Sequence, residues 1–113
     1  MVKLYGIKTC DSVRKARKFL TTHHIPFEFI DFREHPVGEE TILQWLEKSD
    51  LNTLLNTRGT TYRTLGLKAL ELDDEAKITW LAKENMLIKR PVLTLDDKVI
   101  IGYNEDRYIE KLL

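Results

Sequence analysis

Apolar and polar positions divide the first third of the chain into three elements. Residues 2–6 alternate between the two kinds of side chain and end at a glycine, which predicts a short strand. From Asp11 to about His23, apolar residues recur every three or four positions, which predicts an amphipathic helix. Residues 27–32 are apolar on both faces, a pattern typical of an inner parallel strand. The three elements predict a β-α-β unit with a right-handed crossover.

The middle of the chain has a helical pattern. Residues 39–48 and 74–85 carry apolar side chains at helical spacing, and the leucine-rich stretch 51–70 predicts further short helices. The apolar runs 92–95 and 98–101 are separated by two residues, which predicts a β-hairpin.

A closing helix follows the hairpin. Asn104 has the side chain of a helix N-cap, and the acidic residues after it favour a helix start. The order β-α-β, helices, β-β-α predicts an α/β protein with a thioredoxin-like fold and a helical insertion after the second strand. We expect one domain over residues 1–113, with the insertion at about residues 37–88.

Composition narrows the function classes. The 113 residues carry 18 basic and 18 acidic side chains, and no basic stripe indicates direct binding to nucleic acid or a membrane surface. No apolar run approaches the length of a membrane span. One cysteine forms neither an internal disulfide nor a two-cysteine zinc site, and we expect no bound metal. We therefore expect a cytoplasmic monomer.

The single cysteine lies at a position that favours a reactive thiolate. Cys10 lies between the end of the first strand and the start of the first helix, where free N–H groups favour an anion such as a thiolate. Lys8 and Arg14 are close in sequence, although Asp11 acts against them. The alternative is a small buried apolar side chain. Because Val13 replaces the second cysteine of a Cys-x-x-Cys motif, any disulfide must be mixed and resolved by an external thiol.

Two arginines stand at predicted element boundaries. Arg58 lies in the polar segment 57–63, and Arg90 precedes Pro91 at the start of a buried strand. An arginine binds carboxylates and oxyanions through a planar fork, so this pair is a candidate anion site beside the thiolate. The alternative is a pair of ordinary surface arginines.

Three segments resemble one family: residues 4–11 with Lys15 and Ala16 behind them, residues 54–62, and residues 88–91. The chain is similar, over essentially its whole length, to the arsenate-reductase-like (ArsC) proteins of the thioredoxin fold, which include YffB-like proteins and Spx-type transcription regulators. These segments resemble the YffB branch most, whereas residues 102–106 are more like Spx.

The resemblance implies roles for individual residues. Cys10 would be the redox cysteine, and Pro91 a cis-proline. Arg58 and Arg90 would bind glutathione or another anion, and we add Lys8 to these candidates. Glutathione would be a co-substrate, with no bound cofactor.

Two positions depart from the glutathione-coupled arsenate reductases, which use three arginines. Asn56 and Tyr103 stand where the first and third would fall, so arsenate is not the expected main substrate. Spx proteins often carry a Cys-x-x-Cys switch, which Val13 removes, and bind the C-terminal domain of the RNA polymerase α-subunit. We therefore predict a glutathione-dependent thiol/disulfide reductase. The alternatives are an Spx-like regulator that binds the polymerase α-subunit and an arsenate reductase.

Overall fold

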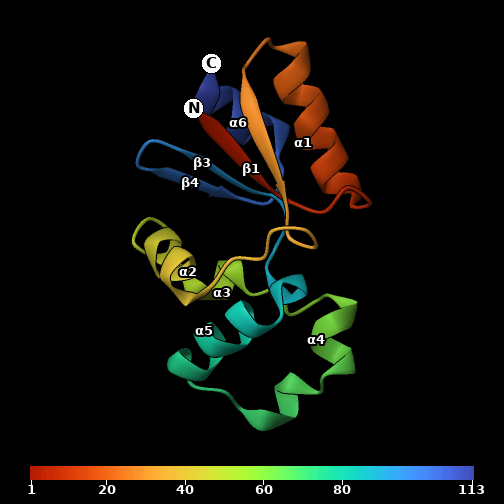
Figure 1. Ribbon diagram of the computed structural model, residues 1–113, viewed down its shortest axis with the longest axis vertical. Helices are drawn as coiled ribbons and strands as arrows, with labels where there is room; N and C mark the ends of the chain where they lie inside the picture. The colour runs from red at the N-terminus through yellow and green to blue at the C-terminus, as the bar shows by residue number, and fades with distance from the viewer. The chain divides into compact units, whose positions relative to one another are not determined.

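Four strands pair in the order β2-β1-β3-β4 in the computed structural model, which describes residues 1–113. β1 and β2 are parallel, and the β1–β3 and β3–β4 pairs are antiparallel (Figure 1). The strands are β1 (Val2–Gly6), β2 (Phe27–Asp31), β3 (Val92–Leu95) and β4 (Lys98–Ile101). The topology is that of a thioredoxin-like α/β fold with a helical insertion after β2.

The prediction that the second strand is an inner strand of the sheet was wrong. β2 lies at the edge of the sheet, because β1 takes β3 as its other neighbour. Its side chains Phe27, Phe29 and Ile30 are only half-buried. Apolar residues on both faces indicate cover above and below a strand, but they do not tell whether it has a partner on each side.

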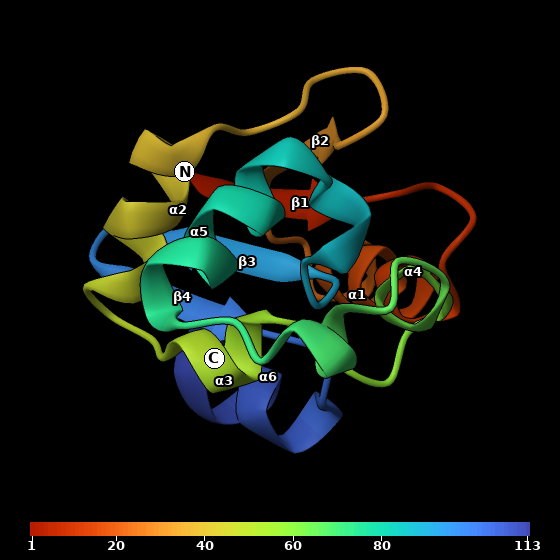
Figure 2. The ribbon, with the colours of Figure 1, turned by 90° about the horizontal axis from the view of Figure 1, so that it is seen from below.

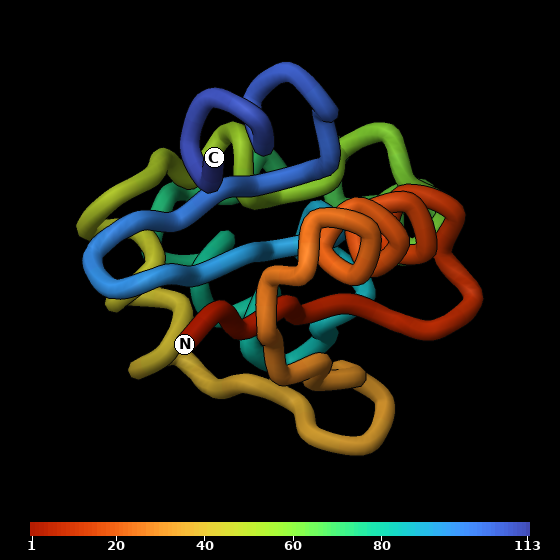
Figure 3. Tube along the Cα trace, turned by 90° about the horizontal axis from the view of Figure 1, so that it is seen from above, coloured from red at the N-terminus to blue at the C-terminus, as the bar shows by residue number.

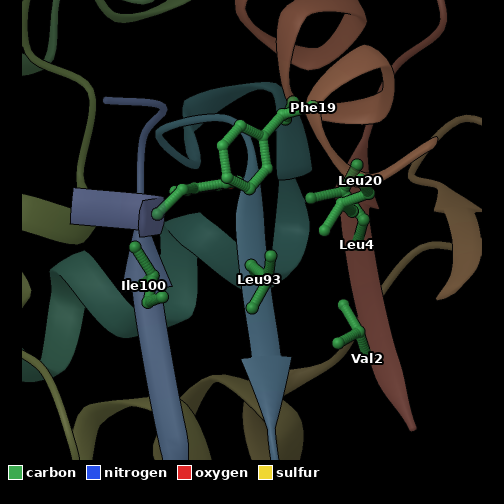
Figure 4. Packing of buried hydrophobic residues seen from close by; sticks show 8 residues of the cluster. Val2, Leu4, Phe19, Leu20, Leu93 and Ile100 are labelled. Atoms are coloured by element: carbon green, nitrogen blue, oxygen red, sulfur yellow. The ribbon is translucent and has the colours of Figure 1, made fainter. Parts of the chain in front are cut away.

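Helices α1 (Asp11–Thr22) and α6 (Glu105–Leu112) pack on one face of the sheet. Leu4, Leu93 and Ile100 lie opposite one another in register and form a row across β1, β3 and β4 (Figure 4). The helices complete this core with Ala16, Phe19, Leu20 and Tyr108. α1 therefore buries the face that its sequence pattern indicated, whereas α6 buries Tyr108 and leaves Ile109 exposed.

The chain divides into two compact units. The sheet unit comprises residues 1–35 and 90–113, and the helical unit comprises residues 36–89. The interpretation of the whole chain as one domain stays a prediction. None of the helices in either unit is long and apolar enough to cross a membrane.

The helical unit consists of short helices, which are prominent in Figure 2. They are α2 (Glu39–Leu46), α3 (Leu51–Leu54), α4 (Thr60–Thr64), the 3₁₀ turn η1 (Leu67–Leu70), α5 (Asp74–Lys83) and the 3₁₀ turn η2 (Asn85–Leu87). α5 ends two residues earlier than expected. The buried Asn85 amide instead donates to Val37 O at 3.1 Å and accepts from Val37 N–H at 2.7 Å, which ties the two ends of the unit together.

The expected hairpin and closing helix are confirmed. Leu95 pairs with Lys98 across the two-residue turn, in which Asp96 adopts a positive φ of 54°. Asn104 caps α6, since its side-chain oxygen accepts a hydrogen bond from Arg107 N–H at 3.0 Å.

Tyr108 generates a prediction about alkaline stability. Its ring is fully buried against Phe19 and Tyr103, and its hydroxyl has no hydrogen-bond partner. Burial raises the pKa of this phenol. Above the ordinary tyrosine value of about 10, the unfolded chain loses this proton while the folded protein keeps it, so stability falls as pH rises.

We expect Tyr108→Phe to leave stability at neutral pH unchanged or higher and to lose part of this alkaline decline. Urea unfolding of both proteins at neutral and alkaline pH measures the difference. Parallel declines in the two proteins would contradict the prediction.

Candidate functional site

Cys10 is the N-cap residue of α1. The sequence pattern placed it between the first strand and the first helix. Its backbone is extended (φ −86°, ψ 127°), and its side chain makes no capping hydrogen bond. The Cys10 carbonyl accepts from Arg14 N–H at 3.0 Å, and the Cys10 N–H donates to Ile7 O at 3.3 Å. Cys10 is half-buried, and its thiol forms no disulfide. Cys10 therefore lies beside the N–H groups of the first helical turn and is not fully buried.

A close contact between Gly6 and Val13 sets the position of this turn. A Cβ atom on Gly6 would lie 2.5 Å from Val13 Cγ2, a separation that real side chains do not adopt. Val13 is fully buried. A glycine at the end of β1 lets α1 begin this close to the strand, with Cys10 as its N-cap.

Asp31 holds the loop that carries Cys10, and the sequence analysis missed this residue. Its side chain is 6% exposed. Oδ2 accepts from Lys8 N–H at 3.2 Å, and Oδ1 accepts from Arg33 N–H at 2.8 Å. A second acidic residue at the end of a strand that is mostly apolar was the signal that could have drawn attention to it.

The cations nearest to Cys10 in sequence already have acidic partners. Arg14 pairs with Asp11 and also donates to the Thr9 carbonyl at 3.3 Å. Lys8 Nζ lies 3.4 Å from a Glu34 carboxylate oxygen, and both side chains are 60% exposed. Exposed pairs contribute about 0–1 kcal/mol, so Lys8 can exchange Glu34 for another anion at little cost.

Arg90 and Pro91 lie at the same end of the sheet as the Cys10 loop. β1 and β3 are antiparallel with Tyr5 opposite Val92, so the chain leaves β1 where it enters β3 (Figure 3). The Arg90–Pro91 peptide bond is cis, as the family resemblance implied. Pro91 is buried, and its carbonyl accepts from Gly102 N–H at 2.8 Å.

Arg58 belongs to the helical unit, in the turn between α3 and α4. Its side chain is exposed, and its N–H donates to Asn56 Oδ1 at 3.3 Å. The Arg58 carbonyl accepts from the Arg63 guanidinium at 3.1 Å. The Asn56 amide packs on Gly59, where a Cβ would meet it at 2.8 Å. Asn56 therefore shapes the turn that presents Arg58.

Tyr103 has an aromatic environment. Its ring makes edge contacts with Phe19 and Tyr108, at centroid distances of 6.4 and 4.8 Å. This position supplies no cation to an anion site. No group of three or more His, Cys, Asp or Glu side chains is arranged to hold a metal ion.

Comparison with known proteins decides the family. The sequence profile of the ArsC family matches residues 5–111. The chain belongs to the ArsC family. An uncharacterized protein from Haemophilus influenzae is 37% identical over 109 residues, which cover 96% of each chain. The global transcriptional regulator Spx of Lactiplantibacillus plantarum is 30% identical over 108 residues, which cover 94% of this chain and 82% of the regulator.

Solved structures of ArsC-like proteins agree with this placement. The YFFB (PA3664) protein superposes with a TM-score of 0.93 at 33% identity, and the match covers 100% of both chains. A possible arsenate reductase from Streptococcus mutans superposes with a TM-score of 0.79 at 35% identity over 92% of both chains. The predicted family and the predicted similarity to YffB and Spx proteins are confirmed.

The Gly6–Val13 contact can be tested with a double-mutant cycle. We expect Gly6→Ala to destabilise this ArsC protein by roughly 1–3 kcal/mol, because the added methyl group collides with Val13. Val13→Ala removes the colliding atoms, so the double variant should lose less stability than the sum of the single losses. Urea unfolding measures the free energies of unfolding, and simple additivity would show that the contact is not tight.

Proposed function

We propose that this ArsC protein is a glutathione-dependent thiol–disulfide reductase in which Cys10 is the nucleophile. The observation that carries the proposal is the position of Cys10 as a half-buried N-cap residue whose side chain makes no capping hydrogen bond. A cysteine at a helix N-terminus favours the nucleophilic thiolate. The absence of a second cysteine in the chain requires an external thiol to complete the reaction.

The proposed reaction has two exchange steps. The Cys10 thiolate attacks the glutathione sulfur of a mixed disulfide R–S–S–G, and the R-thiolate leaves and takes up a proton. The new Cys10–glutathione disulfide is then attacked by the thiolate of a second glutathione, which releases Cys10 as a thiolate and forms oxidised glutathione. One R–S–S–G and one glutathione thus give one R-thiol and one oxidised glutathione.

Different observations support each of the three candidate ligands for an anion. Arg90 is a candidate because it precedes Pro91 at the end of the sheet where the Cys10 loop begins. Lys8 is a candidate because its ion pair with Glu34 is exposed and can be exchanged for a bound anion. Arg58 is assigned to the glutathione carboxylates by the family resemblance alone. In this proposal, the three cations bind the carboxylates while Cys10 reacts.

We expect oxidised glutathione to add one glutathionyl group to the folded protein, at Cys10, and none to Cys10→Ser. Intact-mass spectrometry measures the adduct, and a coupled assay with a glutathione mixed disulfide measures turnover. A wild-type protein that forms no adduct, or a Cys10→Ser variant that keeps the activity, would contradict the proposed function.

We expect Arg90→Ala and Arg58→Ala to slow adduct formation by about tenfold or more, because each removes a charge-assisted hydrogen bond of roughly 1.5–3 kcal/mol. Lys111→Ala is the control, since it removes one positive charge near the C-terminal end of α6. Stopped-flow or quenched mass measurements give the rates. Equal slowing in all three variants would indicate general electrostatic attraction instead of specific ligands.

A second candidate is an Spx-like regulator that binds the C-terminal domain of the RNA polymerase α-subunit. The similarity to Spx over 94% of this chain supports it, whereas Val13 in place of a second cysteine removes a two-cysteine switch. A pull-down with this polymerase domain, run beside the turnover assay, separates the two candidates. Arsenate reduction has less support, because Asn56 shapes a turn and Tyr103 packs among aromatic rings.

A further inference from the structure

The buried Asp31 carboxylate joins the two loops that follow β1 and β2. Oδ2 accepts from Lys8 N–H in the first loop, and Oδ1 accepts from Arg33 N–H in the second. Phe32 N–H also donates to Gly6 O at 2.8 Å, so the strands remain paired up to this point. We propose that Asp31 is a positioning residue for Cys10, an inference that rests on the proposed function of this thiol.

The carboxylate has no salt-bridge partner, although it is 6% exposed. Backbone N–H groups bind its two oxygens, and hydrogen bonds to an ionised acceptor are stronger than those between neutral groups. Burial of such a charge is costly unless these bonds form. Asp31 is therefore fixed in place, and it fixes the Lys8 backbone in turn.

Lys8 is two residues from the nucleophile. The turn between them is short, and it is closed by the Cys10 N–H donating to Ile7 O at 3.3 Å, a long hydrogen bond. Gly6 and Val13 set where α1 begins, whereas Asp31 sets the path of the loop that reaches it. Without the Asp31 bond, Lys8 and Thr9 would have more freedom, and Cys10 would leave its N-cap position more often.

The charge of Asp31 and its effect on the position of Cys10 predict opposite changes in Cys10 reactivity when Asp31 is replaced. A carboxylate near a thiolate opposes the thiolate, so removal of the Asp31 charge alone would raise the reactivity of Cys10. Loss of the N-cap position would lower it, because the thiolate would lose the helix N–H groups. Charged or titratable side chains near Cys10 in sequence or in the adjoining loop are Lys8, Asp11, Arg14, Lys15, Arg33, Glu34 and His35. Among them, Lys8 pairs with Glu34 and Arg14 pairs with Asp11. Their effects are the same in all Asp31 variants that keep the fold.

The test compares Asp31→Asn and Asp31→Ala with Glu28→Gln, which neutralises an exposed carboxylate on the same strand. The rate of Cys10 alkylation by iodoacetamide is measured across pH, and urea unfolding checks that each protein is folded. We expect Asp31→Asn to retain one of the two hydrogen bonds, to react about fivefold to tenfold more slowly at neutral pH, and to shift the midpoint of the pH profile upward. Glu28→Gln should match the wild type.

A faster reaction or a downward shift in Asp31→Asn would overturn the proposal, because it would show that charge and not position dominates. An unchanged rate and profile with lowered stability would also overturn it, since Asp31 would then be only structural. If Asp31→Ala does not fold, the nearly isosteric Asp31→Asn decides. Iodoacetamide measures the reactivity of Cys10 without glutathione. A wild-type protein that does not react with oxidised glutathione would contradict the proposed function, but the comparison of the Asp31 variants would remain valid.

Discussion

The contact between Gly6 and Val13 determines where Cys10, the proposed nucleophile, lies. Because Gly6 has no side chain, the first turn of α1 packs directly on the end of β1 and brings Cys10 to the N-cap. The same strand end pairs with β2 on one side and β3 on the other, so the Asp31 and Pro91 segments begin beside it. A side chain at position 6 would displace the helix start on which this arrangement depends.

The helix start also provides backbone N–H groups beside the thiol. The chain has no net charge, and the nearby cations Lys8 and Arg14 are paired with Glu34 and Asp11. Backbone N–H groups of the first turn have no such acidic partner, and their position is fixed by packing. A site of this kind needs no excess of basic residues, which is consistent with the balanced composition of the chain.

Much of this arrangement could be predicted from local sequence. The spacing of apolar residues located the strands and helices, and the pattern placed Cys10 between β1 and α1. The family resemblance implied the cis bond before Pro91. The edge position of β2 could not be predicted, because strand order depends on pairing between distant segments. The role of Asp31 was hidden for the same reason: its partner Lys8 is 23 residues away. Ion pairs such as Lys8–Glu34 likewise form only once the two loops are folded.

The central claim is that folding makes Cys10 a better nucleophile than the same thiol in an unstructured chain. The most direct measurement compares the rate at which oxidised glutathione modifies the folded protein with the rate for a peptide of residues 7–13, at one pH and ionic strength. The account predicts that the folded protein reacts faster, by about tenfold or more if the helix N-terminus contributes roughly 1.4 kcal/mol. An equal or slower reaction of the folded protein would contradict it.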